Sequence, residues 1–487
     1  STSILRKLCC LAPLITIVST PLLSAPSGRN PSYIEITCIL VLSRITIRHR
    51  SECLHSLFFD MPYHFTMKLL RSLPCIAAVG IAVLSSSCIR GLRVEMRQPV
   101  DRLAAVGTTK FETVAADTVN TPWTSGNHVE ILVNGDKIFP SMLNDIKSAK
   151  KSISFETYLF IEGKMASQFV SAFCERARAG VKVHVILDSV GGMSMGDANY
   201  ERMIKAGVDV KLYHPLNLRN LLRFNVRDHR KIMVIDGKTG YSGGCGVADF
   251  WMGNAQSPEH WRETHYRLTG PVVAQLQENF NENWVKCGGK PLSGIAYYPR
   301  LQRTGKVKAQ AYTASPIDKN YAIPHIYRQA MASARKSIVI KNSYIFLDRP
   351  MMKAVIDARK RGVHVEMIFA WEHTDAWPIR HLSIYQYHKL LKAGVHIYEY
   401  RPSMIHCKVM VIDELFSIIG SANIDPRSLY INDESNVNIL DEGFAKQQLN
   451  IIANDKLDSQ RVLKPPFFWN PVTIPSRAAV TVIAPQL

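Results

Sequence analysis

The stretch IHCKVMVID, residues 405–413, has the apolar pattern of a buried strand but carries His406, Lys408 and Asp413. Side chains alternate between the two faces of a strand, so His406 and Lys408 point to one face and Cys407 to the other. Asp413 is an odd number of residues from His406, and we expect it to brace the turn that follows. For one isolated copy, an edge strand with a solvated His–Lys pair is an equally good interpretation.

The arrangement occurs twice. DHRKIMVIDG, residues 228–237, repeats it with His229, Lys231 and Asp236 at the same spacings. The flanking segments repeat in the same order: SAKKSISFETYLF (148–160) with SARKSIVIKNSYIF (333–346), RARAGVKVHVILD (176–188) with ARKRGVHVEMIFA (358–370), and YERMIKAGVDVKLYHP (200–215) with YQYHKLLKAGVHIYEYRP (385–402). Each triplet has the periodicity of a strand, a helix and a Val-rich strand. The sequence therefore predicts two similar α/β halves.

The doubled H-x-K-x4-D pattern, followed in the second copy by GSAN (420–423), resembles the phospholipase D superfamily. The resemblance runs from about Gly126 to Arg461. ETYLF, RDHRKIMVIDG, WRETHYRLTGPVVAQLQENF and NIDPRSLYINDESN are similar to the bacterial cardiolipin synthase branch. The implied fold is two tandem α/β domains, each a mixed sheet flanked by helices, related by a pseudo-twofold axis with one shared active site.

The repeated residues suit phosphodiester chemistry. One imidazole can attack phosphorus, and a second, protonated one can deliver a proton to the departing alcohol. Two histidines meet only if the halves pack face to face, and Lys231 and Lys408 would then flank the non-bridging oxygens. The resemblance implies His229 as nucleophile and His406 as general acid, with Asp236 and Asp413 completing the catalytic motifs. We expect no cofactor and no metal, because neither motif has a metal-ligand pattern near it.

Further site residues follow from parity and from the resemblance. Ser421 and Asn423 are two residues apart, so a strand would present both to one cavity, where they would bind phosphate together with the lysines; an ordinary strand end is the alternative. Glu434 matches the family's acid that orients the second histidine, and Glu263 occupies the comparable place after the first motif. Either could instead be a surface acid.

The first half departs from the family pattern. Gly244 and Gly246 stand where the second half has Ser421 and Asn423, so the usual Asn is missing. Asp228 stands where an Asn commonly precedes the first histidine. These changes predict a lower activity or a changed substrate.

The rest of the chain divides by composition. We expect an unassigned extension (1–66), an export signal or membrane anchor (67–88), a linker (89–125), the two phospholipase D-like domains (126–300 and 301–461) and a tail (462–487). MKLLRSLPCIAAVGIAVLSSSC, residues 67–88, has a positive start and an apolar run too short for a membrane span. Lipidation at Cys88 and simple cleavage both stay open. We expect a membrane-associated protein of the bacterial cell envelope.

The charge does not by itself identify the substrate. The chain has 59 Lys and Arg against 40 Asp and Glu, and this excess of positive charge attracts nucleic acid and anionic bilayers alike. PLNLRNLLRFNVRDH (215–229) interleaves apolar residues with Arg as an interfacial loop would, although an amphipathic core helix fits equally; KPPFFWNP (464–471) adds an aromatic patch. We therefore expect an anionic phospholipid and the membrane surface as partners, nucleic acid as the less favoured one, and no obligate protein partner.

The function predicted is phosphatidyl transfer between phosphatidylglycerol molecules through a phosphohistidine, as in cardiolipin synthesis. Three alternatives remain: a phospholipase D that hydrolyses headgroups and a phosphodiesterase acting on nucleic acid, both with the same residues, and an inactive lipid-binding homologue. The cysteines have no framework spacing, so we expect no essential disulfide.

Overall fold

The computed structural model describes residues 104–215, 223 and 225–464. The predictions for residues 1–88, including Cys88, and for most of the 215–229 and 464–471 segments lie outside this part of the chain. Among the helices that are described, none has the length and hydropathy needed to cross a bilayer.

The described chain begins with a helix where the sequence predicts a linker. Helix α4 (Thr109–Val119) is capped by Thr108, whose Oγ1 accepts a hydrogen bond from the N–H of Phe111 (3.2 Å). Phe111, Ala115 and Val119 are spaced four residues apart and are buried against the second half, beside helix α9 (Ala322–Ser333). The last part of the expected linker therefore belongs to the folded body.

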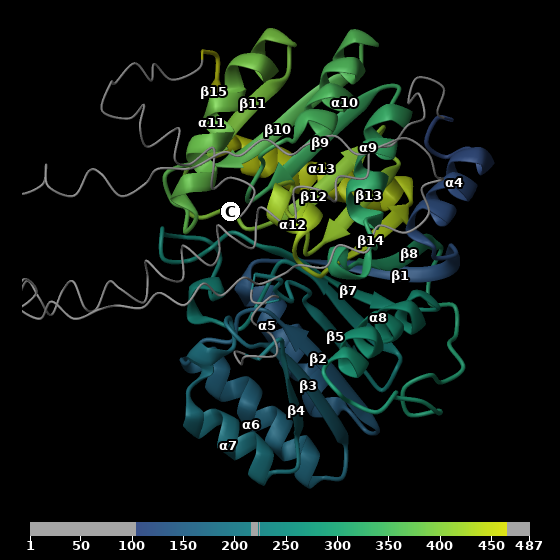
Figure 1. The fold of residues 1–487 in the computed structure, drawn as a ribbon, viewed down its shortest axis with the longest axis vertical. Helices are drawn as coiled ribbons and strands as arrows, with labels where there is room; N and C mark the ends of the chain where they lie inside the picture. The colour runs from purple at the N-terminus through teal and green to yellow at the C-terminus, as the bar shows by residue number, and fades with distance from the viewer. Residues whose placement is uncertain (1–103, 216–222, 224, 465–487) are drawn as a thin grey trace, which may run out of the picture. The chain divides into compact units, whose positions relative to one another are not determined.

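The first half, in blue and teal in Figure 1, alternates strands with helices. Its elements are β1 (Thr124–Val133), α5 (Gly135–Ser148), β2 (Ser152–Thr157), α6 (Lys164–Arg178), β3 (Lys182–Asp188), α7 (Asp197–Lys205), β4 (Asp209–Tyr213), β5 (Ile232–Ile235), β6 (Thr239–Gly243), β7 (Thr264–Thr269) and α8 (Val272–Lys286). β2, β3 and β4 are parallel, and β5 returns antiparallel to β2.

The second half repeats this order. Its elements are β8 (Val307–Ala314), α9, β9 (Ser337–Asn342), α10 (Arg349–Lys360), β10 (His364–Ala370), α11 (Trp377–Lys392), β11 (His396–Tyr400), β12 (Lys408–Ile412), β13 (Phe416–Gly420), α12 (Pro426–Tyr430), β14 (Glu434–Leu440), α13 (Glu442–Leu457) and β15 (Ser459–Val462). β9, β10 and β11 are parallel, and β12 returns antiparallel to β9. The predicted internal repeat is confirmed.

One 15-stranded sheet runs through both halves, in the order β15-β11-β10-β9-β12-β13-β14-β8-β1-β7-β6-β5-β2-β3-β4. Apart from the edge strand β15, this order is the same when read from either end with equivalent strands exchanged, which is the signature of a pseudo-twofold axis. The halves join edge to edge where β1 pairs antiparallel with β8, and β6 also packs against β13 and β14. The expected twofold relation is confirmed, with a continuous sheet in addition to the face-to-face contact.

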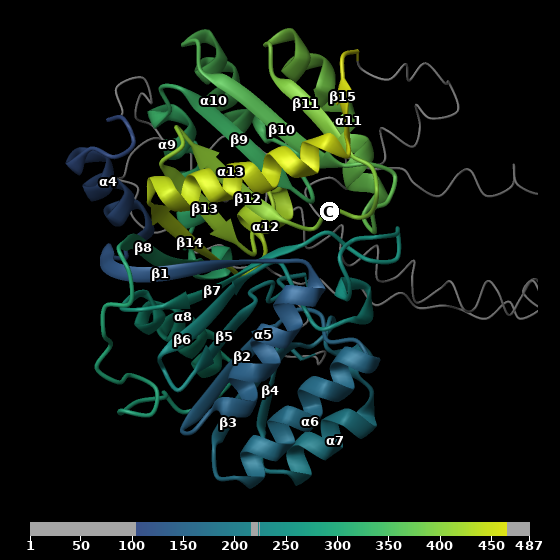
Figure 2. The same cartoon turned by 180° about the vertical axis from the view of Figure 1, so that it is seen from behind.

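Three apolar cores support this sheet. One lies under α5 and α6 and another under α9 and α10. The third is shared by both halves: it contains Leu276 and Phe280 of α8, Phe444 and Ile452 of α13, and strand residues from each half. Figure 2 shows α13 crossing the strands of the second half, where it packs against β12 and β13. This shared core holds the two motif strands, β5 and β12, in fixed relation.

Candidate active site

The backbone of each motif histidine is anchored on the opposite half. Asp228 forms a short parallel bridge with Asp433, and Ile405 forms one with Arg262. The N–H of His229 donates to the carbonyl oxygen of Asp433 (2.9 Å). The equivalent bond of the second motif joins the N–H of His406 to the carbonyl oxygen of Arg262 (2.7 Å).

These bridges correct the predicted strand boundaries. The sequence predicts a strand from residue 405, but β12 begins at Lys408 and β5 at Ile232. The residues before them pair with the other half instead of with their sheet neighbours. Each histidine therefore lies at the junction between the halves.

The acids that support the histidines are exchanged between halves. Nδ1 of His229 is 2.9 Å from Oε1 of Glu434, and Nδ1 of His406 is 2.7 Å from Oε2 of Glu263. Both carboxylates have no exposed surface. The sequence predicts that Glu434 orients His406; the structure corrects this, because Glu434 contacts His229 and Glu263 contacts His406. Each pairing leaves Nε2 as the ring nitrogen available for phosphorus chemistry.

The two motif lysines belong to the same site. Nζ of Lys231 donates to the carbonyl oxygen of His229 (2.6 Å), and Nζ of Lys408 donates to that of His406 (2.6 Å). Nζ of Lys408 also donates to Oγ of Ser343 (2.7 Å). Burial is the main cause that holds the pKa of both histidines well below its usual range, and the charges of both lysines add to it at each ring. Each lysine therefore acts on both histidines.

Burial also shifts the protonation of the supporting groups toward neutrality. It raises the pKa of Glu263 to about 7 against the opposing charge of Lys408, and that of Glu434 to about 7 against the charge of Lys231. It lowers the pKa of Lys231 to about 7. A phosphodiester anion between the lysines would stabilise their ammonium forms and a protonated imidazole. The site is thus suited to an anionic substrate.

Ser421 and Asn423 are both buried beside this site, but they differ in role. Oγ of Ser421 donates to Oε2 of Glu434 (2.5 Å), so the hydroxyl supports the acid that holds His229. Oδ1 of Asn423 has no hydrogen-bond partner among the described residues. Oδ1 of Asn423 can therefore accept a hydrogen bond from a hydroxyl of the substrate.

Gly244 and Gly246 of the first half lie where a larger side chain would collide with neighbouring atoms. A Cβ at Gly244 would lie 2.5 Å from Oε2 of Glu263 and 2.8 Å from the carbonyl oxygen of His406. A Cβ at Gly246 would lie 3.0 Å from Cζ3 of Trp251. The indole of Trp251 thus occupies the space next to Gly246, and its ring lies 5.3 Å from that of His406.

Asp236 and Asp413 lie on turns, away from the histidines. Oδ1 of Asp413 accepts hydrogen bonds from the N–H groups of Lys336 (2.7 Å) and Ser337 (2.9 Å). Asp236 binds the start of β2 in the same way, and both aspartates have positive φ (53° and 54°). Asp413 does lie in the turn after its strand, as expected, but its carboxylate braces the start of β9 instead of that turn. Their place in the catalytic set is corrected to a structural one, since each lies beyond the far end of its motif strand from the histidine.

Four aromatic residues that the motifs do not predict also lie at the site. Tyr158 packs on His229 with ring centroids 5.5 Å apart, and Lys231 lies over the same tyrosine at 5.6 Å. Trp261 and Tyr344 pack on His406 at 5.3 and 6.5 Å, together with Trp251. Tyr158 and Tyr344 stand at the same place in the first repeated segment, which is the signal that could have identified them.

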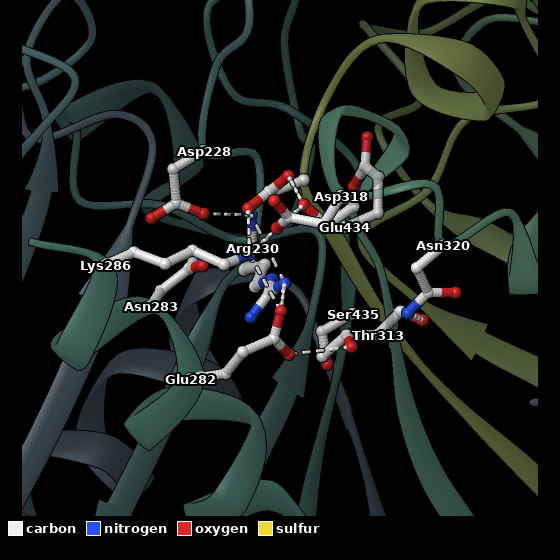
Figure 3. Close-up of polar contacts among 12 residues, drawn as sticks. Asp228, Arg230, Glu282, Asn283, Lys286, Thr313, Asp318, Asn320, Glu434 and Ser435 are labelled. Carbon is white, nitrogen blue, oxygen red and sulfur yellow. Dashed lines mark hydrogen bonds and ion pairs between the residues drawn. The ribbon is translucent and has the colours of Figure 1, made fainter. Parts of the chain in front are cut away.

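A buried charge cluster surrounds Arg230, the residue that follows His229 in the sequence (Figure 3). The side chain of Arg230 has no exposed surface; its Nη2 is 3.2 Å from Oε1 of Glu282 and 3.6 Å from Oδ2 of Asp433. Burial and the nearby Glu156 raise the pKa of Asp228 well above its usual range, and burial raises that of Glu156 to about 7. Near neutral pH this pair of acids therefore retains a proton. That proton allows the carboxyl group of Asp228 to lie close to Glu156, at a position where an Asn is common in the family.

A family model described as "Cardiolipin synthase, PLD-like domain" matches residues 142–284 and 327–456. The chain belongs to this family. Among relatives of the cardiolipin synthase family, the major cardiolipin synthase ClsA of Bacillus subtilis (strain 168) is 30% identical over 362 residues, which are 74% of this chain and 75% of that protein. The minor cardiolipin synthase ClsB of the same organism is 32% identical over 336 residues, 68% of this chain and 82% of that protein.

A solved structure supports the fold assignment. The crystal structure of phosphatidylserine synthase from Haemophilus influenzae Rd KW20 superposes with a TM-score of 0.61 at 12% identity, over 77% of this chain and 100% of that one. At this identity the likeness bears on the fold alone. The predicted superfamily, the cardiolipin synthase branch and the two-half fold are confirmed.

Proposed function

We propose that this protein is a phosphatidyltransferase that joins two phosphatidylglycerol molecules into cardiolipin and releases glycerol. The observation that carries the proposal is the pair of imidazoles, one from each half, held by exchanged buried acids and sharing two lysines. This set can perform double displacement at phosphorus with residues of the chain itself. The relatives named cardiolipin synthases supply the substrate class.

In the first step Nε2 of His229 attacks the phosphorus of a phosphatidylglycerol. The bond from phosphorus to the headgroup oxygen breaks, and the protonated His406 gives its proton to that oxygen, so that glycerol leaves. Lys231 and Lys408 stabilise the charge on the non-bridging oxygens, and Glu434 stabilises the positive ring of the phosphohistidine.

In the second step the hydroxyl of another phosphatidylglycerol takes the place of the glycerol. The now neutral His406 accepts the hydroxyl proton, the oxygen attacks phosphorus, and the bond from phosphorus to Nε2 of His229 breaks. Cardiolipin forms, and both histidines return to their starting protonation. If water attacks instead, phosphatidic acid forms, so exclusion of water decides between transfer and hydrolysis. The packing of Trp251, Trp261 and Tyr344 on His406 favours exclusion.

The location proposed is the surface of the bacterial envelope membrane. An export signal or anchor at residues 67–88 would deliver the domains 126–300 and 301–461, with the tail 462–487, to anionic phospholipid. The basic charge of the chain favours such a surface.

The proposal is tested by incubating the purified protein with labelled phosphatidylglycerol, added glycerol and single-stranded DNA, with and without EDTA. We expect cardiolipin and glycerol as products, intact DNA and no effect of EDTA. His229→Ala and His406→Ala should each abolish turnover with unchanged circular dichroism, while His128→Ala, an exposed histidine on β1, should retain it. Release of nucleotides without lipid products would overturn the substrate, and a strict metal requirement would overturn the mechanism.

A further inference from the structure

Three potential metal ligands gather at the N-terminal ends of β10 and β11. His364 begins β10 and His396 begins β11. Glu366 is two residues after His364, so both side chains lie on one face, and the parallel register places Glu366 beside His396. All three side chains therefore project from two hydrogen-bonded strands toward one point.

The ligand atoms are close together. Nε2 of His364 is 2.9 Å from Oε1 of Glu366, and Nδ1 of His396 is 4.0 Å from the same oxygen. The two imidazole rings are 4.7 Å apart and perpendicular, and the three ligand atoms lie within 4.8 Å of one another. Zinc bonds to such ligands are about 2.0–2.2 Å long, so bound ligand atoms stand roughly 3–4 Å apart. Side-chain movements of about 1 Å would suffice.

The surroundings prepare the carboxylate for this role. Nζ of Lys456, from α13, donates to Oε2 of Glu366 (2.5 Å), which leaves Oε1 directed at the two rings. Burial opposes ionisation of Glu366, but its bonds with Lys456 and His364 outweigh this and hold its pKa below the usual value. Burial, followed by the charge of His364, lowers the pKa of His396. Oε1 of Glu366 is therefore the carboxylate oxygen that would bind an ion together with the two rings.

Solvent also reaches the group. The side chains of His364 and His396 are 45% and 33% exposed, and that of Glu366 is 13% exposed. An ion can therefore enter, and a water molecule can complete its coordination.

The repeat provides an internal comparison. Aligning the repeated segments places Lys182, His184 and Asp209 of the first half opposite His364, Glu366 and His396. An ammonium group replaces one imidazole there, and Nε2 of His184 is already bonded to the hydroxyl of Tyr297 (2.7 Å). Among the described residues, the second-half group is the one set of three that meets the distance criterion for a metal.

We propose that His364, Glu366 and His396 bind one divalent transition-metal ion of the zinc, cobalt and nickel class. Two imidazoles and one carboxylate match the ligand preference of these ions, whereas magnesium and calcium prefer oxygen ligands. The catalytic histidines lie near the opposite, C-terminal ends of these strands, since Lys408 pairs with Asn342 at the end of β9. With β10 spanning about 20 Å at roughly 3.3 Å per residue, the ion would tie two strands together without touching the reaction.

The test uses the full chain after dialysis against EDTA. Cobalt is added while visible absorption is followed, zinc binding is measured by calorimetry, and thermal unfolding is recorded with and without zinc. We expect one high-affinity equivalent, cobalt bands of nitrogen and oxygen coordination, and a higher unfolding temperature with zinc. His364→Ala and His396→Ala should each weaken that binding at least about tenfold and remove the thermal shift.

His128→Ala is the matched control. His128 and Glu130 on β1 have the same His-x-Glu spacing on a strand, but no second histidine joins them in a set of three. This variant should bind zinc as the unaltered chain does. The proposal is overturned if no saturable binding occurs, or if either His364→Ala or His396→Ala, with circular dichroism unchanged, binds as tightly as the control.

Discussion

The exchange of acids between the halves predicts which chemical step each carboxylate serves. Glu434 holds His229, so Glu434→Gln should impair nucleophilic attack. Glu263 holds His406, so Glu263→Gln should impair protonation of the leaving group. In each variant the amide keeps the size of the side chain but no longer stabilises a positive imidazole or selects its tautomer.

The expected size of the effect follows from the geometry. Both acids are completely buried and lie 2.9 and 2.7 Å from the histidine nitrogens. A hydrogen bond to a charged group contributes about 1.5–3 kcal/mol, and loss of the correct tautomer in a buried acid–histidine pair lowers kcat by up to about 10⁴-fold. We therefore expect each single variant to lower kcat about 10²- to 10⁴-fold.

The assay compares two leaving groups. Phosphatidylglycerol needs an acid to expel its glycerol, whereas a phosphatidyl ester of p-nitrophenol expels a stable phenolate without one. Glu263→Gln and His406→Ala should therefore recover most of their rate of headgroup release on the aryl ester, while Glu434→Gln and His229→Ala should not. Glu442→Gln, an exposed glutamate on α13, is the control and should match the unaltered enzyme on both substrates. If Glu434→Gln instead behaved as His406→Ala does, the exchange of acids would be refuted.

Three further perturbations follow from the buried charges. Glu156→Gln removes an acid whose pKa is about 7 instead of 4.5, so the contribution of Glu156 to stability is complete below pH 4.5 and is lost as the pH rises to about 7. The variant should therefore gain stability relative to the parent over that range, by about 3 kcal/mol in urea unfolding at pH 7. A gain in stability that does not depend on pH would contradict this. Asp413→Ala removes three backbone hydrogen bonds and should lower the free energy of unfolding by about 1–3 kcal/mol, while kcat per folded molecule stays unchanged. A large loss of kcat would show that Asp413 is a catalytic residue after all. Lys231 has a pKa of about 7, so kcat/KM should fall as the pH rises through 7. Lys231→Arg, whatever its absolute rate, should move this fall in kcat/KM to higher pH. If the fall stays at the same pH, it arises from the titration of another group.

Much of the fold could be predicted because the same order of sequence segments occurs twice in the chain. The repeated segments predict the strands β2 to β5 and β9 to β12, and the duplicated motif predicts a twofold relation. Helix α4 escaped prediction although Thr108 is a good cap and Phe111, Ala115 and Val119 share one face. A short amphipathic helix beside a signal segment looks like a linker until the core that covers it is known.

The site was predictable residue by residue but not in its pairings. His229, Lys231, His406 and Lys408 follow from the motif. No local pattern tells whether Glu434 serves the histidine of its own half, because that depends on how the halves are joined. The ligands of the proposed metal site escaped for a related reason: they come from two neighbouring strands, so their spacing in the sequence matches no metal motif.

The most direct test of the account is to trap the covalent intermediate. A single turnover with phosphatidylglycerol labelled in its phosphate, quenched in alkali and digested, should place the label on the peptide that contains His229 through an acid-labile bond. The label should be absent in His229→Ala and should be discharged when unlabelled phosphatidylglycerol is added before the quench. Turnover without labelled protein, or label on another residue, would contradict a reaction in which one histidine holds the phosphatidyl group while its counterpart from the other half moves the proton.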